Sequence, residues 1–306
     1  MKILLTHDGS EMADVAVPRV QALALAAGPQ TEVVALCITT SHADAGSAES
    51  TEAARSLDRI KRALGARGVR EITALVLAGS PGSLIAETAE RLNCDLIAMS
   101  TSGHSGPKQF LGSVADYVVR HSRGIPVMLC RPEPANREPF KKVLLPLDGS
   151  ELNAGALVQA QRIASMTGAG IVLLRLVDTV EQIRSITTPA GYELGADVAA
   201  DGALRQIIAA EHAAAQRELG ADATRLRDAG LADVSVVITP GTPGETIVET
   251  AEQLGCDVIV MSSHGRGRRD GARLLGSVAD HVLQHVAHAA VLLVPPAGGG
   301  ARSSTA

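Results

Sequence analysis

The amino-acid sequence predicts an α/β protein made of two tandem, doubly wound, five-stranded parallel-sheet sandwiches of the Rossmann-like type. Three observations lead to this prediction. The chain has 306 residues, which suits two domains of about 150 residues each. Its main motifs occur twice in the same order. Within each copy, short apolar runs alternate with segments of helical periodicity, which is typical of a parallel sheet covered by helices on both faces.

The expected strands of the first copy follow one another closely along the chain. They are the apolar runs Lys2–Thr6, Glu32–Thr39, Glu71–Leu77, Leu96–Ser100 and Pro126–Cys130. Between them, Glu11–Ala27 and Gly82–Leu92 carry apolar residues three and four positions apart, as amphipathic helices do. Five strands joined by right-handed crossovers give a doubly wound sheet.

The repeat fixes the expected domain organisation. ILLTHDGS recurs as VLLPLDGS, ETAERLNCDLIAMS as ETAEQLGCDVIVMS, and LGSVADYVVRH as LGSVADHVLQH. We expect a first domain at residues 1–132 and a second at 142–296. The prolines and charges of residues 133–141 indicate a linker, and the small polar residues 297–306 indicate a disordered tail. The second copy carries about twenty extra residues near 179–231, including an Ala-rich helix candidate at Asp201–Ala229.

The expected ligand position follows from the strand order of such sheets. Ligands bind outside the carboxyl ends of the strands, where the strand order reverses. The polar, Gly-rich loops of this chain follow the first and fourth strands of each copy. If these two strands are neighbours, both loops face one crevice, so we expect one crevice in each copy.

The loop after the fourth strand ends at the start of a helix. In the repeated GSVAD motif, an acidic residue lies three positions after a serine: Asp116 after Ser113, and Asp280 after Ser277. This [ST]-x-x-[DE] pattern predicts a capping box. A helix N-terminus fed by a Gly-rich loop is also a natural seat for phosphate. Because loop, cap and motif all recur, phosphate binding is favoured over capping alone.

The aspartates after the first strand, Asp8 and Asp148, allow three interpretations. Before Gly-Ser, an Asp is a common turn former. A phosphoacceptor needs further acidic residues around it, and the third strand ends in LAG or ITPG instead. A contact to the base or sugar of a nucleotide fits the expected crevice. We rank the nucleotide contact first, the turn former second, and reject the phosphoacceptor.

The sequence gives little support for catalysis or for a metal site. It contains no GxxxxGK[ST] loop and no GxGxxG after a strand. Ser10, His104 and Asp8 have no G-x-S-x-G nucleophile elbow around them. His7, His104 and His264 do not recur at a metal-binding spacing. We therefore expect no catalytic residues and no metal site built by the protein.

Composition and charge limit the partners. The net charge is −5 and aromatic residues make up 1% of the chain, so neither a basic face nor stacking rings are available for nucleic acid. The N-terminus lacks a signal-peptide pattern, and no apolar run is long enough to span a bilayer. The four cysteines form no CxxC pair. We expect a cytoplasmic protein with no nucleic-acid or membrane partner.

With the DGS and GSVAD motifs in both copies, the sequence resembles the universal stress protein family over nearly its whole length. The resemblance implies an ATP-binding α/β fold, with ATP carried with Mg²⁺ and little turnover. In the second copy it implies ligand contacts at Pro146, Asp148, Val177, Met261, Ser262, Gly265, Gly276, Ser277 and Val278. In the first copy it implies contacts at Asp8, Ile38, Met99, Ser100, Gly103, Gly112, Ser113 and Val114.

The sequence departs from the family pattern G-x-x-G, nine residues, G-[ST] in both copies. Ser100 and Ser262 replace the first glycine. Eight residues separate Gly103 from Gly112 in the first copy, and ten separate Gly265 from Gly276 in the second. Thr6 stands where the second copy has Pro146. A short loop reaches less far around a triphosphate, whereas a long one can bulge outward. We therefore expect the second site to bind better than the first.

The last strand of each copy is short and apolar, and is expected at a sheet edge, where an unpaired strand invites association. The resemblance implies that the two copies pair along this edge as an intramolecular pseudo-dimer, with a homodimer of whole chains also open. We expect an ATP-binding protein of the stress response that signals without strong catalysis. Two alternatives stay open: an ATP-using enzyme, such as a slow ATP hydrolase or a nucleotidyl transferase, and a scaffold that binds no nucleotide.

Overall fold

The computed structural model describes residues 1–39, 48–101, 111–131, 140–179, 198–263 and 275–296. Gly103 and Gly265, most of the expected linker and the expected tail lie outside them. In the first half the strands are β1 (Lys2–Thr6), β2 (Glu32–Thr39), β3 (Glu71–Ala78), β4 (Leu96–Ser100) and β5 (Val127–Cys130). The helices are η1 (Ala13–Ala16), α1 (Val17–Ala26), α2 (Ala48–Ala66), α3 (Pro81–Arg91) and α4 (Ser113–His121).

The second half repeats this order. Its strands are β6 (Lys142–Pro146), β7 (Gly170–Val177), β8 (Val234–Pro240), β9 (Val258–Ser262) and β10 (Ala290–Val294). Its helices are η2 (Glu151–Asn153), α5 (Ala154–Thr167), α7 (Val198–Asp228), α8 (Pro243–Gln253) and α9 (Ser277–His285). The helix candidate at Asp201–Ala229 is therefore confirmed as α7, with ends shifted by a few residues.

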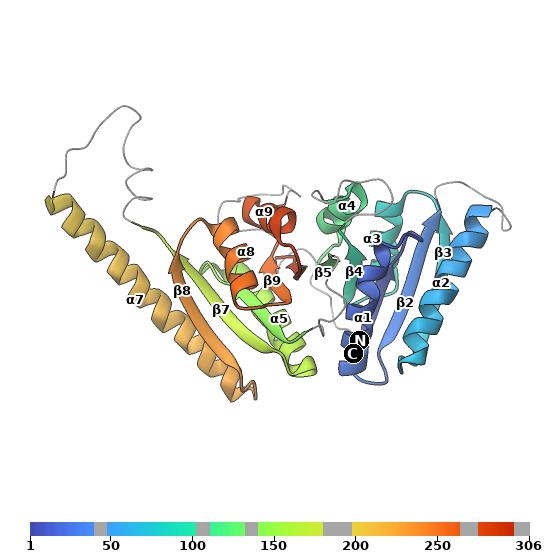
Figure 1. Ribbon diagram of the computed structural model, residues 1–306, viewed down its shortest axis with the longest axis horizontal. Helices are drawn as coiled ribbons and strands as arrows, with labels where there is room; N and C mark the ends of the chain where they lie inside the picture. The colour runs from blue at the N-terminus through green and yellow to red at the C-terminus, as the bar shows by residue number, and fades with distance from the viewer. Residues whose placement is uncertain (40–47, 102–110, 132–139, 180–197, 264–274, 297–306) are drawn as a thin grey trace, which may run out of the picture.

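The strands form one sheet in the order β3-β2-β1-β4-β5-β10-β9-β6-β7-β8 (Figure 1). β1 pairs with β4, and β6 with β9, so the polar, Gly-rich loops that follow these strands are neighbours in each half, as expected. Within each half all pairings are parallel. The predicted pairing between the last strands is also present, because β5 and β10 run antiparallel side by side. The two five-stranded sheets are thus joined into one sheet of ten strands.

The core lies in two layers, one on each face of the sheet. Side chains of a strand point alternately to opposite faces, so Ile3 and Leu5 belong to one layer and Leu4 to the other. The first layer contains buried residues of α1, α2, α5 and α7, and the second those of α3, α4, α8 and α9. Each layer continues across the β5–β10 junction. In Figure 1, α2 and α7 lie along the outer strands β3 and β8.

Part of the expected linker, residues 133–141, takes part in the core. Residues 132–139 lie outside the described part, but Phe140 is 3% exposed and belongs to the core layer under α1 and α5. The guanidinium of Arg19, in α1, lies 6.0 Å from the centre of the Phe140 ring. The chain is therefore packed against the first half before β6 begins. No helix in the described part of the chain combines the length and apolar character that crossing a bilayer requires.

Candidate functional site

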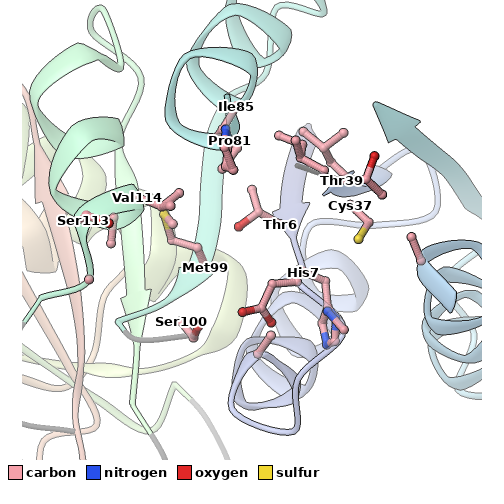
Figure 2. A pocket seen from close by; sticks show the side chains of 18 of the residues that line it. Thr6, His7, Cys37, Thr39, Pro81, Ile85, Met99, Ser100, Ser113 and Val114 are labelled. Carbon is pink, nitrogen blue, oxygen red and sulfur yellow. The ribbon is translucent and has the colours of Figure 1, made fainter. Parts of the chain in front are cut away.

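The carboxyl ends of the strands in the first half border a cavity of about 570 Å³. Side chains from the ends of β1, β2 and β4, and from the starts of α3 and α4, surround it (Figure 2). Every site residue predicted for this copy within the described ranges lines it: Asp8, Ile38, Met99, Ser100, Gly112, Ser113 and Val114. The fold therefore brings the two predicted loops to one cavity.

The second half has a corresponding cavity of about 860 Å³. Predicted residues that line it are Pro146, Asp148, Met261, Ser262, Gly276, Ser277 and Val278. Both volumes lie within the range of small-molecule sites, roughly 300–1,000 Å³. The larger cavity belongs to the copy that the sequence favours.

The structure does not place the predicted site residue Val177 with the others of the second copy. Val177 is not among the described residues that line the second cavity, whereas Leu176 and Asp178 are. The strand registers explain the difference. Thr6 pairs with Leu36 and Pro146 with Leu174, so the residue that matches Ile38 is Leu176.

The predicted capping boxes are also wrong. The N-cap of α4 is Gly112, in extended conformation, and Ser113 is already the first helical residue. The Asp116 backbone N–H donates to the Gly112 carbonyl oxygen at 2.9 Å. The Asp116 carboxylate accepts from Arg120 Nη2 and does not cap the start of α4. In α9, Gly276 is likewise the N-cap. In the described part of the structure no side chain caps either helix start.

The open helix starts have an electrostatic consequence. The first backbone N–H groups of a helix lack partners inside the helix, and they carry partial positive charge. Ser113 and Val114 line the first cavity, and Ser277 and Val278 line the second. Each cavity is therefore bordered by a helix N-terminus that suits an anion such as phosphate.

The two loop aspartates form the turns of the second interpretation. Asp8 Oδ1 accepts from the backbone N–H of Ser10 at 3.0 Å and from its hydroxyl at 2.6 Å. Asp148 Oδ1 accepts from the backbone N–H of Ser150 at 2.9 Å and from Asn153 Nδ2 at 2.5 Å. Each carboxylate thus holds its own turn while lining a cavity. The turn fixes where that carboxylate stands.

His7 has a structural place beside the first cavity. Its buried ring accepts from the backbone N–H of Gly9 at Nδ1, 3.0 Å away, so Nε2 carries the hydrogen that is donated to Asp14 Oδ1 at 2.9 Å. Asp14 in turn binds Arg59 Nη1 at 2.8 Å. Burial lowers the pKa of His7 despite the nearby Asp14 carboxylate. The described residues include no group of three or more His, Cys, Asp or Glu that could hold a metal ion.

The two cavities differ in charge. Among its described lining residues the first has the acidic Asp8, Glu49 and Glu52, and no Lys or Arg. The second contains two arginines, Arg120 and Arg175, in addition to acidic side chains. A cation in the cavity wall attracts phosphate, so the second cavity is electrostatically the better anion site.

Arg175 is a functional candidate that the motif search missed. It lies in β7, where the matching residue of β2 is Cys37, and its side chain is 10% exposed. Its Nη1 donates to the Leu147 carbonyl oxygen and its Nη2 to Glu218 Oε2, both at 3.2 Å. A charged residue inside the apolar run IVLLRLV was the available signal, because a buried charge requires partners.

Comparison with known proteins agrees with this architecture. The model of the family described as "Universal stress protein family" matches residues 1–131 and again 139–295. The chain belongs to the universal stress protein family. As a tandem member it is 29% identical over 146 residues to Universal stress protein MJ0577 of Methanocaldococcus jannaschii, a match covering 47% of this chain and 89% of that protein.

Solved structures of the family extend the likeness to the whole chain. A universal stress protein from Archaeoglobus fulgidus superposes with a TM-score of 0.65 at 22% identity, covering 98% of this chain and 97% of the other. A putative universal stress protein from Pseudomonas aeruginosa gives a TM-score of 0.66 at 20% identity, covering 96% and 93%. At these identities the likeness concerns the fold.

Proposed function

We propose that the chain binds an adenine nucleotide, ATP carried with Mg²⁺, in the second cavity. In this proposal it is a nucleotide-dependent protein of the stress response that works without strong catalysis. The observation that carries the proposal is the start of α9. Gly276 leads into a helix whose first residues, Ser277 and Val278, line the cavity with no side-chain cap among the described residues. Phosphate oxygens are the acceptors that such a helix start favours.

The remaining walls suit the nucleoside part. Leu176 and Met261 give apolar surface at the ends of β7 and β9. Asp148, held by its turn, offers a carboxylate oxygen to sugar hydroxyls or base amino groups. This division, with apolar and acceptor groups at one end and a helix start at the other, matches the two ends of a nucleotide.

The proposed Mg²⁺ fits as a companion of the phosphates. No cluster of described acidic or histidine side chains forms a metal site of its own. Mg²⁺ commonly keeps several waters and is held through one or two carboxylates together with substrate phosphates. Asp178 is a further carboxylate in the cavity wall that would be available to such a shell. When bound, the ion would neutralise part of the phosphate charge.

Calorimetry on the full chain, freed of co-purified nucleotide, tests the proposal. We expect ATP with Mg²⁺ to bind with a stoichiometry near one. Asp148→Asn keeps the turn acceptor but removes the charge, and should weaken binding about 10- to 100-fold, as expected for a hydrogen bond to a charged group. Asp8→Asn is the matched control in the first cavity and should leave binding unchanged. Absence of ATP binding in folded, nucleotide-free protein would overturn the proposal.

A further inference from the structure

The second cavity includes one residue from the other half of the chain. Arg120 lies in α4, in the first half, and lines the cavity together with Ser277 and Asp280 of α9. All other described residues that line it belong to the second half. The cavity wall is therefore complete only when both halves are in place.

Arg120 is held in a defined orientation. Its Nε lies 2.8 Å from both carboxylate oxygens of Asp116, and its Nη2 lies 2.6 Å from Asp116 Oδ1. The Arg120 side chain is 24% exposed. The hydrogen bonds to Asp116, with a further contribution from the charge of Asp280 across the junction, raise the pKa of Arg120. A permanent cation thus stands beside the start of α9.

A second arginine of the first half fixes α9 at this place. Arg131, directly after β5, is 9% exposed, and its Nη2 donates to the carbonyl oxygen of Leu283 in α9. Together with the β5–β10 pairing, this bond ties α9 to the half that carries Arg120. The Arg131–Leu283 hydrogen bond and the β5–β10 pairing therefore hold Arg120 and the α9 start in a fixed relation.

The arrangement is not reciprocal. In the repeated motif, LGSVADYVVRH of α4 matches LGSVADHVLQH of α9, so Gln284 occupies the position of Arg120. Gln284 Nε2 donates to Asp280 at 2.8 Å, and Gln284 is not among the described residues lining the first cavity. The first half supplies a cation to the second cavity, whereas the residue at the matching position of the second half is neutral.

The chemistry of the second cavity gives this cation a purpose. Four carboxylates line it, those of Asp148, Asp178, Glu211 and Asp280. A polyphosphate seated at the α9 start meets the nearby charge of Asp280, which repels it. Arg175 lies at the β7 end, where it binds Leu147 and Glu218. Arg120, which is held by Asp116, is the lining arginine whose charge interacts with that of Asp280.

We propose that Arg120 is a phosphate-binding residue that the first half supplies to a nucleoside polyphosphate in the second cavity. It selects polyphosphate over monophosphate, because the outer phosphates carry the additional negative charge. This inference rests on the proposed function of the second cavity. It also implies that the ligand contacts both halves at once, so binding strengthens their association.

The test uses calorimetric titration of the full chain with Mg-ATP and with AMP. Arg120→Gln installs the residue that the repeat itself carries at the matching position. We expect it to weaken ATP binding about 10- to 100-fold, the range for a lost charge-assisted hydrogen bond, while AMP binding stays at the wild-type value. Arg120→Lys keeps the charge but not the planar fork, and should recover part of the ATP affinity.

Arg123→Gln is the matched control, because Arg123 is an exposed arginine just beyond α4 that pairs with Glu90 and lines neither cavity. It should change neither affinity. If wild-type protein binds ATP and Arg120→Gln binds it equally well, this inference fails and the proposed function stands. Equal weakening of ATP and AMP would also refute it, because phosphate selection predicts a difference. If wild-type protein binds no ATP, both proposals fail together.

Discussion

The junction of β5 with β10 predicts an energetic coupling between the two halves that a double-mutant cycle can measure. Leu129 and Val291 stand directly opposite each other across this junction, are at most 1% exposed, and belong to the same core layer. Leu129→Ala should lower the free energy of unfolding by about 2–5 kcal/mol, and Val291→Ala by about 2 kcal/mol. Because opposing side chains touch, the double variant should deviate from additivity by about 0.5–3 kcal/mol.

The assay is urea denaturation followed by circular dichroism, with one cycle for the junction and one for a control. The control combines Leu129→Ala with Val172→Ala, a buried valine of the same core layer. Val172 lies in β7, four strands from β5, or roughly 19 Å at the usual strand spacing. This cycle should be additive within about 0.5 kcal/mol. Equal additivity in both cycles would refute packing across the junction.

Three further predictions concern single residues. Burial lowers the pKa of His7, so the unfolded chain binds the proton first as the pH falls, and the free energy of unfolding should decrease on acidification through about pH 6.5. His7→Leu should flatten this decrease in urea titrations, and an unchanged slope would contradict the prediction. Gly82→Ala places a Cβ 2.7 Å from Tyr117 Cδ1 and should lower the free energy of unfolding by about 1–3 kcal/mol. Gly220→Ala, whose Cβ would have nothing within 4 Å, should raise it by about 0.5–1 kcal/mol. Thermal unfolding measures both. Burial raises the pKa of Cys37 to about 11, so at pH 8 its thiol should react with an alkylating reagent far more slowly in native than in unfolded protein; equal rates would show that it is not buried.

The strands and the location of both cavities could be predicted because the relevant signals are local. The apolar runs that became β1, β2 and β4 have the predicted bounds, since each is a short stretch between turn-forming residues. The DGS and GSVAD motifs follow neighbouring strands, and parallel strands bring such loops to one edge. Repetition of the motifs indicated that there are two such places.

The errors and omissions concern properties that a linear pattern does not carry. β7 is apolar on both faces apart from Arg175, so no alternation indicates whether Leu176 or Val177 faces the cavity. The capping box failed because the backbone angles of Gly112, and not the spacing of Ser and Asp, decide where α4 begins. The place of Arg120 depends on how the two halves meet, which only the tertiary structure reveals.

The β5–β10 junction, formed within one chain, also determines how the two cavities can diverge in evolution. In a dimer of two identical subunits, every substitution changes both cavities at once. In this chain each cavity-facing position is encoded twice, so Cys37 and Arg175 differ although they occupy matching places in their strands. The residues of one cavity can therefore change without altering the other cavity, while the continuous ten-stranded sheet keeps both in a single molecule.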